Sequence, residues 1–209
     1  MAFPSSKSWL GTGYFKLLTW LGPRDVLHGL PVWMPLLRPQ ERAIAYERLN
    51  EALDLLRDHI PSRYSRARRL LKGFIVFGTD SASGSYDPGN GVCRLNEKFV
   101  TDPATTATAI ASTVVHEATH AWLTSLGVGY ESQIRHRVEL VCIKASLLAM
   151  RRIPGAEAEV ARCRHDMSID PEFFSNEKRI ERSATHLREL GCPEWFVRMV
   201  VWIGRKRAA

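Results

Sequence analysis

Strand-type patterns occur only in the first half of this sequence, and this division constrains the fold more than any other feature. FIVFG at residues 74–78 is a short apolar run typical of a buried strand. GSYDPGNGVCRLN at residues 84–96 predicts two short strands around the turn signals DP and NG. Beyond residue 100 no strand pattern appears. A small sheet followed by an almost wholly helical half indicates an α+β fold with segregated elements.

Helical periodicity marks the other expected elements. Apolar residues at helical spacing predict a helix over residues 42–60, which Pro61 ends. Asp102 suits an N-cap and Pro103 suits the first position of the next helix, which runs to Gly127. The remaining helices are expected over residues 131–153, 156–165, 171–190 and 193–204.

Residues 1–40 differ from the rest of the chain because they are rich in aromatic residues, Gly and Pro and lack a clear period. Their aromatic side chains include Trp9, Tyr14, Phe15, Trp20 and Trp33. We expect this segment to cover the core or a groove, with a peripheral membrane contact as the alternative. Residues 41–209 are then expected to form one domain, the default for a chain of 209 residues.

The composition, 45% hydrophobic and 24% charged, is that of an ordinary globular protein that can build a core. The formal net charge of +7 permits contact with an anionic surface. The basic cluster between Arg63 and Lys72 is interpreted as a solvated helix face, because only Tyr64 offers a stacking platform within it, and nucleic acid is therefore a disfavoured partner. The C-terminal run EWFVRMVVWIGRKRAA is interpreted as a core or dimer helix, with a membrane-surface helix as the alternative.

The cysteines and the N-terminus indicate a reducing, cytoplasmic location. Cys93, Cys142, Cys163 and Cys192 are widely spaced and form no C-x-x-C pair, so we expect free thiols. The N-terminal residues lack a clean secretory pattern because Lys16 interrupts their apolar part. No window reaches the roughly 18–20 apolar residues that cross a bilayer.

The run VVHEATHAWL, residues 114–123, places an H-E-x-x-H pattern within an apolar helix. Residues four apart lie on one helix face, so the imidazoles of His116 and His120 can reach one metal ion. Glu117 is rotated about 100° from His116, where it can flank the metal and accept a proton from a bound water. Zinc lowers the pKa of such a water to about 7. The pattern therefore predicts one catalytic Zn²⁺, with His116 and His120 as ligands and Glu117 as the general base.

Catalytic zinc takes three protein ligands, and Glu139 is the leading candidate for the third. Glu139 precedes ten residues whose only charge is Lys144, so its carboxylate needs a partner. A salt bridge to Arg135 one turn earlier is the alternative interpretation of Glu139. Glu131 and His136 are alternative ligands, although the helix dipole alone would explain a carboxylate at Glu131.

The helix that carries Glu139 is expected to present two stripes of side chains. One stripe holds Arg135, Glu139, Cys142 and Ser146. The other, expected to face the core, holds Ile134, Val138, Val141, Ala145 and Leu148. We expect the stripe with Glu139 to lie against the face that carries His116 and His120.

HEATH followed by Glu139 resembles the gluzincin (HExxH…E) branch of the zincin metallopeptidases, over roughly residues 73–150. The resemblance implies a zincin-like fold, with His116, His120 and Glu139 as zinc ligands and Glu117 as general base. It also implies a short sheet whose edge strand aligns an extended substrate, a role that the hairpin at residues 84–96 could fill. The chain departs from thermolysin-like members at Ile143, where they carry an acidic residue, and from metzincins at Leu123 and Leu126.

The expected function is that of a zinc-dependent metallopeptidase acting on a peptide or protein substrate. One alternative is a non-proteolytic zinc-binding regulatory or self-processing protein, whose cleft residues 1–40 would cover. Another is a basic helical protein that binds nucleic acid or membrane and carries the motif incidentally. Candidates for the group that polarises the substrate are Tyr130, Arg135, His136 and His186. The oligomeric state stays open.

Overall fold

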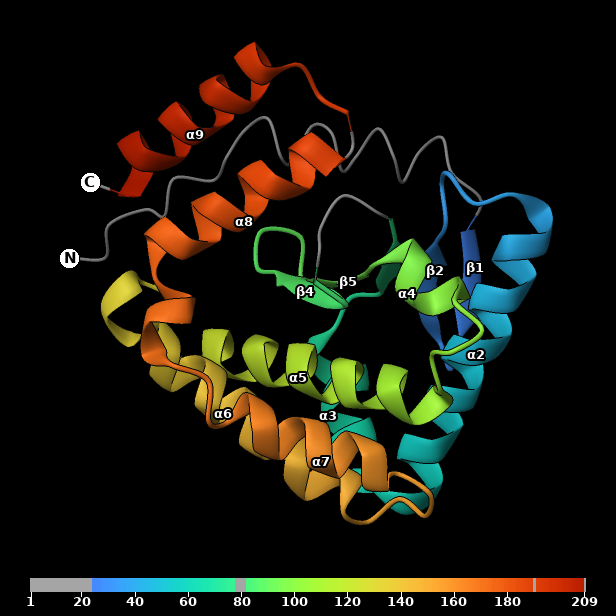
Figure 1. The fold of residues 1–209 in the computed structure, drawn as a ribbon. Coiled ribbons are helices and arrows are strands. Elements are labelled where there is room, and N and C mark those ends of the chain that lie inside the picture. Colours follow the sequence, from blue (N-terminus) through green and yellow to red (C-terminus); the bar gives the residue numbers. More distant parts are fainter. Residues whose placement is uncertain (1–23, 78–81, 190, 209) are drawn as a thin grey trace.

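The computed structural model describes residues 24–77, 82–189 and 191–208. Predictions that concern Trp9, Tyr14, Phe15 and Trp20 lie outside these residues. In the described part of the chain, every strand ends before residue 96 and helices make up the rest of the regular structure (Figure 1). The expected α+β class, with a small sheet ahead of a mostly helical second half, is confirmed.

The sheet has five strands in the order β1-β2-β3-β5-β4. They are β1 (Arg24–Leu27), β2 (Leu30–Trp33), β3 (Phe74–Val76), β4 (Gly84–Asp87) and β5 (Val92–Leu95). β2, β3 and β5 run parallel, whereas β1 and β4 are antiparallel edge strands. The predicted hairpin at residues 84–96 is confirmed as β4 and β5, with Gly84 opposite Leu95 and Asp87 opposite Val92.

The hairpin of β1 and β2 was missed by the sequence analysis, which placed residues 24–33 in a covering segment. Its two-residue turn is His28-Gly29, with φ of 52° and 79°. Such a turn needs positive φ at both positions, and the usual signal is Asn-Gly or Asp-Gly. His28 is held in this conformation by tertiary contacts, since its Nδ1 lies 2.8 Å from the Tyr64 hydroxyl and its Nε2 lies 3.5 Å from Asp54.

The helices are α2 (Pro39–His59), α3 (Pro61–Leu70), α4 (Glu97–Thr101), α5 (Ala107–Ser125), α6 (Ser132–Met150), α7 (Glu157–Asp166), the 3₁₀ helix η1 (Pro171–Phe174), α8 (Asn176–Glu189) and α9 (Glu194–Ala208). The predicted start at Asp102-Pro103 was wrong. Thr106 is the N-cap of α5 and accepts a hydrogen bond from the Ala109 amide at 3.2 Å. Asp102 instead ends α4 and accepts from the Ala104 amide, which turns the chain between the two helices.

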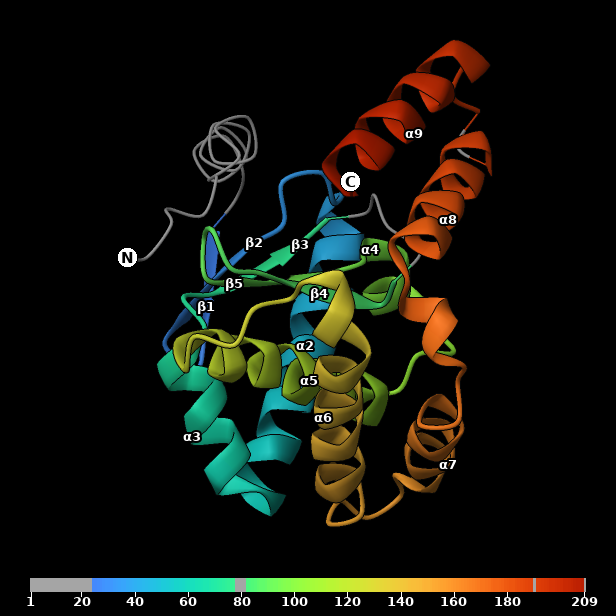
Figure 2. The same cartoon turned by 90° about the vertical axis from the view of Figure 1, so that its left-hand side faces the viewer.

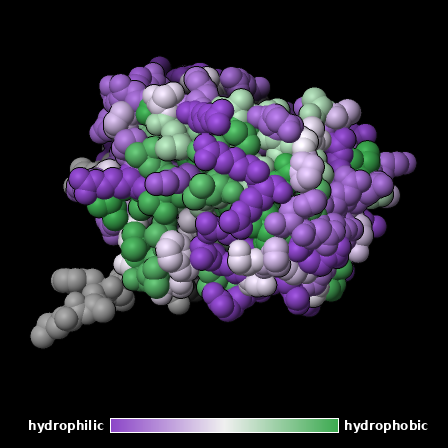
Figure 3. All heavy atoms as spheres, turned by 90° about the horizontal axis from the view of Figure 1, so that it is seen from below, coloured by the Kyte–Doolittle hydropathy of each residue, from purple (hydrophilic) through white to green (hydrophobic). Residues whose placement is uncertain are grey.

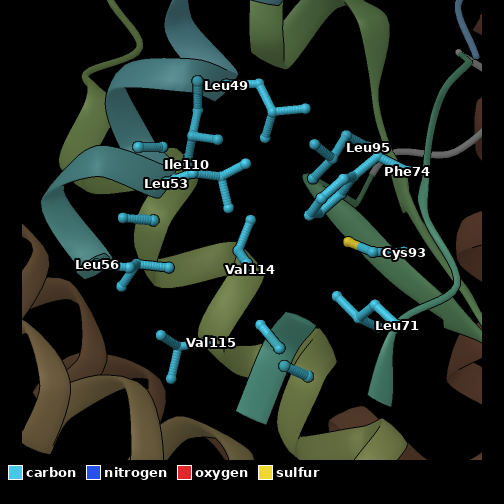
Figure 4. Close-up of a cluster of buried hydrophobic side chains, with 14 of the residues drawn as sticks. Leu49, Leu53, Leu56, Leu71, Phe74, Cys93, Leu95, Ile110, Val114 and Val115 are labelled. Atoms are coloured by element: carbon cyan, nitrogen blue, oxygen red, sulfur yellow. The ribbon is translucent and has the colours of Figure 1, made fainter. Parts of the chain in front are cut away.

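The hydrophobic core lies between one face of the sheet and the helices α2 and α5. Figure 4 shows Leu49, Leu53, Leu56, Ile110 and Val114 converging with Phe74 and Leu95 of the strands. All of these side chains are fully buried. Because α5 packs against α2, the sheet and α6, it is the central helix of the described residues.

Leu53→Ala in α2 is expected to lower the free energy of unfolding by about 2–5 kcal/mol, because the side chain is fully buried and its loss leaves a cavity. Urea denaturation followed by circular dichroism measures this change. Leu36→Ala is the matched control: Leu36 is 64% exposed, so its removal should alter stability by no more than about 0.5 kcal/mol. Equal losses at the two positions would contradict a core between α2, α5 and the sheet.

α8 and α9 pack side by side and form a C-terminal arm (Figure 2). The predicted helix over residues 171–190 is divided here, because η1 ends at Phe174 and the extended backbone of Ser175 separates it from α8. Across the described residues, none of the helices combines the length and the apolar character needed to cross a bilayer.

Candidate metal centre

α5 carries the HEATH motif on the side of the helix that turns away from the hydrophobic core. Ile110, Val114 and Ala118 on the opposite side are buried in the core. His116 and His120, four residues apart, keep side-chain exposed fractions of 23% and 14%. The motif therefore lies on the central helix, with its imidazoles partly open to solvent.

The turn after α5 brings α6 back along it. Gly127 takes φ of 78°, and the amide of Val128 donates to the carbonyl of Leu123 at 3.0 Å. This is the glycine-ended helix cap that reverses a chain direction. Ser146 of α6 then donates to the carbonyl of Ser112 of α5 at 3.1 Å, in a buried position. These contacts set the rotation of α6 about its own axis and thus decide which of its side chains face α5.

The stripe with Glu139 faces α5, as predicted, and its four members are all buried: Arg135, Glu139, Cys142 and Ser146. The predicted core stripe of the same helix was partly wrong. Val138 and Ala145 are buried and Ile134 is half-buried, but Val141 and Leu148 are 44% and 46% exposed. The polar stripe is buried in their place because it meets the polar groups of α5.

The structure brings His116, His120 and Glu139 together. Nε2 of His116 lies 3.1 Å from Oε2 of Glu139, Nε2 of His120 lies 3.5 Å from Oε1, and the two Nε2 atoms are 3.2 Å apart. Zinc–nitrogen and zinc–oxygen bonds of about 2.0–2.1 Å give an edge of about 3.3 Å between ligands of a tetrahedron. The donor set therefore fits zinc in type and in spacing.

The electrostatics of Glu139 favour its ionised form. Burial alone would raise the pKa of this carboxyl group, but hydrogen bonds and charge from His116 and His120 bring the pKa well below its usual value. The hydroxyl of Tyr130 donates a further hydrogen bond to Oε1. Burial and the adjacent Glu139 charge raise the pKa of Tyr130, so it remains a neutral donor. An ionised carboxylate is the form that binds a metal.

Glu117 lies beside this cluster and is only 5% exposed. Burial raises the pKa of its carboxyl group, while His116, His120 and a hydrogen bond from the Tyr86 backbone amide act in the opposite direction. The Tyr86 contact connects the side chain to the edge strand β4. Glu117 thus borders the cluster of His116, His120 and Glu139 without belonging to it, as the helical geometry predicts.

The other candidate residues are not among the donor groups that converge here. Glu131 is exposed at the start of α6, and His136 packs on the ring of Phe174 at 5.5 Å between centroids. Arg135 donates to the carbonyl of Phe174 at 3.0 Å, which anchors η1. His186 lies 3.7 Å from a carboxylate oxygen of Glu189 on the same helix. Of the polarising candidates, Tyr130 contacts the cluster through its hydrogen bond to Glu139.

Cys142 is a potential ligand that the sequence analysis did not consider. Its sulfur and the imidazole nitrogens of His116 and His120 lie within 4.8 Å of one another. The available signal was its position one turn after Glu139, on the same stripe. Burial strongly raises the pKa of the Cys142 thiol. Glu139 is the better third ligand because its oxygens are already 3.1–3.5 Å from the nitrogens.

Two hollows meet at the cluster. The larger has a volume of about 510 Å³ and is lined by β4, by His116, Glu117 and His120 of α5, by Tyr130, and by η1 and α8. The smaller, about 140 Å³, lies beside Arg162 and Asp166 of α7. His116 and Glu117 border both hollows. A reacting group next to Glu117 therefore has space on two sides.

Comparison with known proteins gives no relative. No protein-family model, no curated protein and no solved structure matches this chain.

Proposed function

We propose that this protein is a zinc-dependent peptidase that holds one Zn²⁺ with His116, His120 and Glu139. One observation carries the proposal: three donor groups from two helices converge to 3.1–3.5 Å beside a buried carboxylate that borders a cleft. Two imidazoles and one carboxylate leave an open position on tetrahedral zinc, which is typical of catalytic rather than structural sites.

The residues around the site have different roles in the proposed reaction. A bound zinc ion supplies Lewis acidity, which polarises the scissile carbonyl and acidifies the attacking water. Glu117 accepts the proton of that water and passes it to the leaving amine. Its burial suits this role, because burial raises the pKa of the carboxyl group and so makes Glu117 a stronger base than a solvated glutamate. Tyr130 orients Glu139 through its hydrogen bond.

The edge strand β4 offers a binding surface for an extended peptide. β4 pairs with β5 on one side, and Gly84, Ser85 and Tyr86 line the cleft. An extended segment can add to such an edge through backbone hydrogen bonds. Gly84 lets the strand lie close on α5, since a Cβ atom there would meet Thr113 at 2.6 Å. The strand thus holds a substrate backbone beside Glu117.

Another part of the cleft lining favours apolar substrate side chains. Leu123, Val128, Phe173 and Phe174 line the cleft. The guanidinium of Arg182 lies over the Phe173 ring at 3.9 Å and donates to its carbonyl at 2.8 Å, which fixes this wall. We therefore expect cleavage sites flanked by apolar residues.

Incubation of the zinc-loaded protein with a mixed peptide library, read by mass spectrometry, tests the proposal. We expect peptide cleavage that a chelator stops and added zinc restores. A form that begins at residue 24 keeps β1 and β2, and it shows whether the preceding residues restrict the cleft. If both forms bind one zinc ion per chain and neither cleaves any peptide, the protein is a non-proteolytic zinc protein and the proposal fails.

A further inference from the structure

α9 presents two apolar faces, and among the described residues one of them packs against α8 while the other is exposed. On the packed face Val197 is fully buried, and Gly204 lies so close to α8 that a Cβ atom would meet Ile180 at 3.1 Å. Ala184 of α8 is buried in the same interface. The helix is therefore already attached to the protein through one side, and the other side is not needed for that attachment.

The outer face of α9 exposes Trp195, Met199 and Trp202. Their exposed fractions are 68%, 41% and 62%. At 100° per residue these positions fall within roughly 60° of one another, on the side opposite Val197 and Gly204. Two tryptophans in one exposed stripe are unusual on a soluble surface and mark an interaction site. Figures 1 and 2 show α9 at the periphery of the molecule, beside α8.

Positive charges accompany this stripe. Lys206 continues it, with its Nζ 5.3 Å from the Trp202 ring centroid. Arg198 and Arg205 lie along one flank of the stripe, and both are exposed. The acidic Glu194 at the helix start pairs with Arg188 at 2.9 Å and more loosely with Arg198 at 3.9 Å. The outer face is thus both aromatic and cationic.

We propose that α9 binds the surface of an anionic lipid bilayer, with Trp195, Met199 and Trp202 at the headgroup level and Arg198, Arg205 and Lys206 on lipid phosphates and carboxylates. Tryptophan and basic side chains are the pairing that interfacial helices use. Charge favours this occupant over a second copy of the chain, because a twofold contact through this face would bring the cations of both copies together. The proposal does not depend on peptidase activity.

Exposed apolar surface alone does not make a membrane-binding site. Figure 3 shows hydrophobic side chains gathered in one part of the underside of the molecule, among hydrophilic ones. On α6, Val141 and Leu148 are 44% and 46% exposed and have the same spacing of seven residues as Trp195 and Trp202. They form a matched control pair, because they are exposed and apolar but lack the indole ring.

Flotation of the full chain with vesicles tests the proposal. We expect binding to phosphatidylcholine vesicles with about 30% phosphatidylserine to be at least about tenfold tighter than binding to phosphatidylcholine alone, and to weaken with added salt. Trp195→Ala/Trp202→Ala should reduce binding at least about tenfold, whereas Val141→Ala/Leu148→Ala leaves it unchanged.

Charge reversal on α9 provides a second test of the proposal. Arg198→Glu/Lys206→Glu should lose the preference for phosphatidylserine, while the equal charge change Arg69→Glu/Arg164→Glu, on α3 and α7, should keep most of it. Full binding by the tryptophan variant, or equal losses in a variant and its control, would overturn the proposal. So would a stable dimer in light scattering that only the tryptophan variant dissociates, because the face would then belong to a second copy.

Discussion

Glu139→Ala is expected to remove zinc from the protein. The substitution deletes the charged donor and leaves two imidazoles, so zinc affinity should fall by more than about 100-fold. Replacing a residue that only hydrogen-bonds to a ligand typically costs less than this. Elemental analysis after dialysis should show one zinc ion per wild-type chain and almost none in the variant. Far-ultraviolet circular dichroism establishes that the helices remain.

Two further variants locate the third ligand. Glu131→Ala is the matched control, since Glu131 is an exposed carboxylate at the start of the same helix and should keep its zinc. Cys142→Ser tests the sulfur that lies within 4.8 Å of the imidazole nitrogens. If Glu139→Ala keeps its zinc and Cys142→Ser loses it, the donor set is His116, His120 and Cys142, and our assignment of Glu139 is wrong.

Glu117→Gln is expected to lower kcat for peptide cleavage by about 10²–10⁴-fold while the zinc content stays at one ion per chain. Glutamine keeps the size of the side chain and can still accept the hydrogen bond from the Tyr86 amide, but it cannot take up a proton. The kinetics are measured on a peptide identified in the library, together with the zinc content of the same sample.

Asp166→Asn is the matched carboxylate control for Glu117. Asp166 borders the smaller hollow but pairs with Arg162 at 2.9 Å and is not part of the cluster of His116, His120 and Glu139. We expect its kcat to remain within a few-fold of the wild type. Wild-type turnover in Glu117→Gln, with zinc bound, would refute the role of Glu117 as general base.

Local signals predicted the elements that local interactions stabilise. The hairpin of β4 and β5 was predicted because its turn residues and flanking apolar residues lie within one short stretch, and Asp87 accepts hydrogen bonds from the Gly89 amide and from the Asn90 side chain. The hairpin of β1 and β2 was not predicted, because its turn needs a positive φ at His28. Contacts of His28 with Tyr64 and Asp54 stabilise that conformation. Those contacts come from residues 26 or more positions away.

The start of α5 illustrates competition between two plausible caps. Asp102 and Thr106 are both good N-cap residues, and Pro103 favoured the first. In the structure α4 occupies residues up to Thr101, so Asp102 is used to end that helix and Thr106 begins the next. Local preference allowed either start, and the preceding helix selected one.

The spacing of the motif by itself determined that His116 and His120 share one face of a helix with Glu117 beside them, because 3.6 residues per turn leave no other arrangement. Only the tertiary structure decided which side chains of α6 meet that face. The rotation of α6 depends on the turn at Gly127 and on the buried contact of Ser146 with Ser112, and it exposes Val141 and Leu148 while it buries Glu139 and Cys142. Helix rotation is set by packing between elements, and a periodic pattern along one chain segment does not contain it.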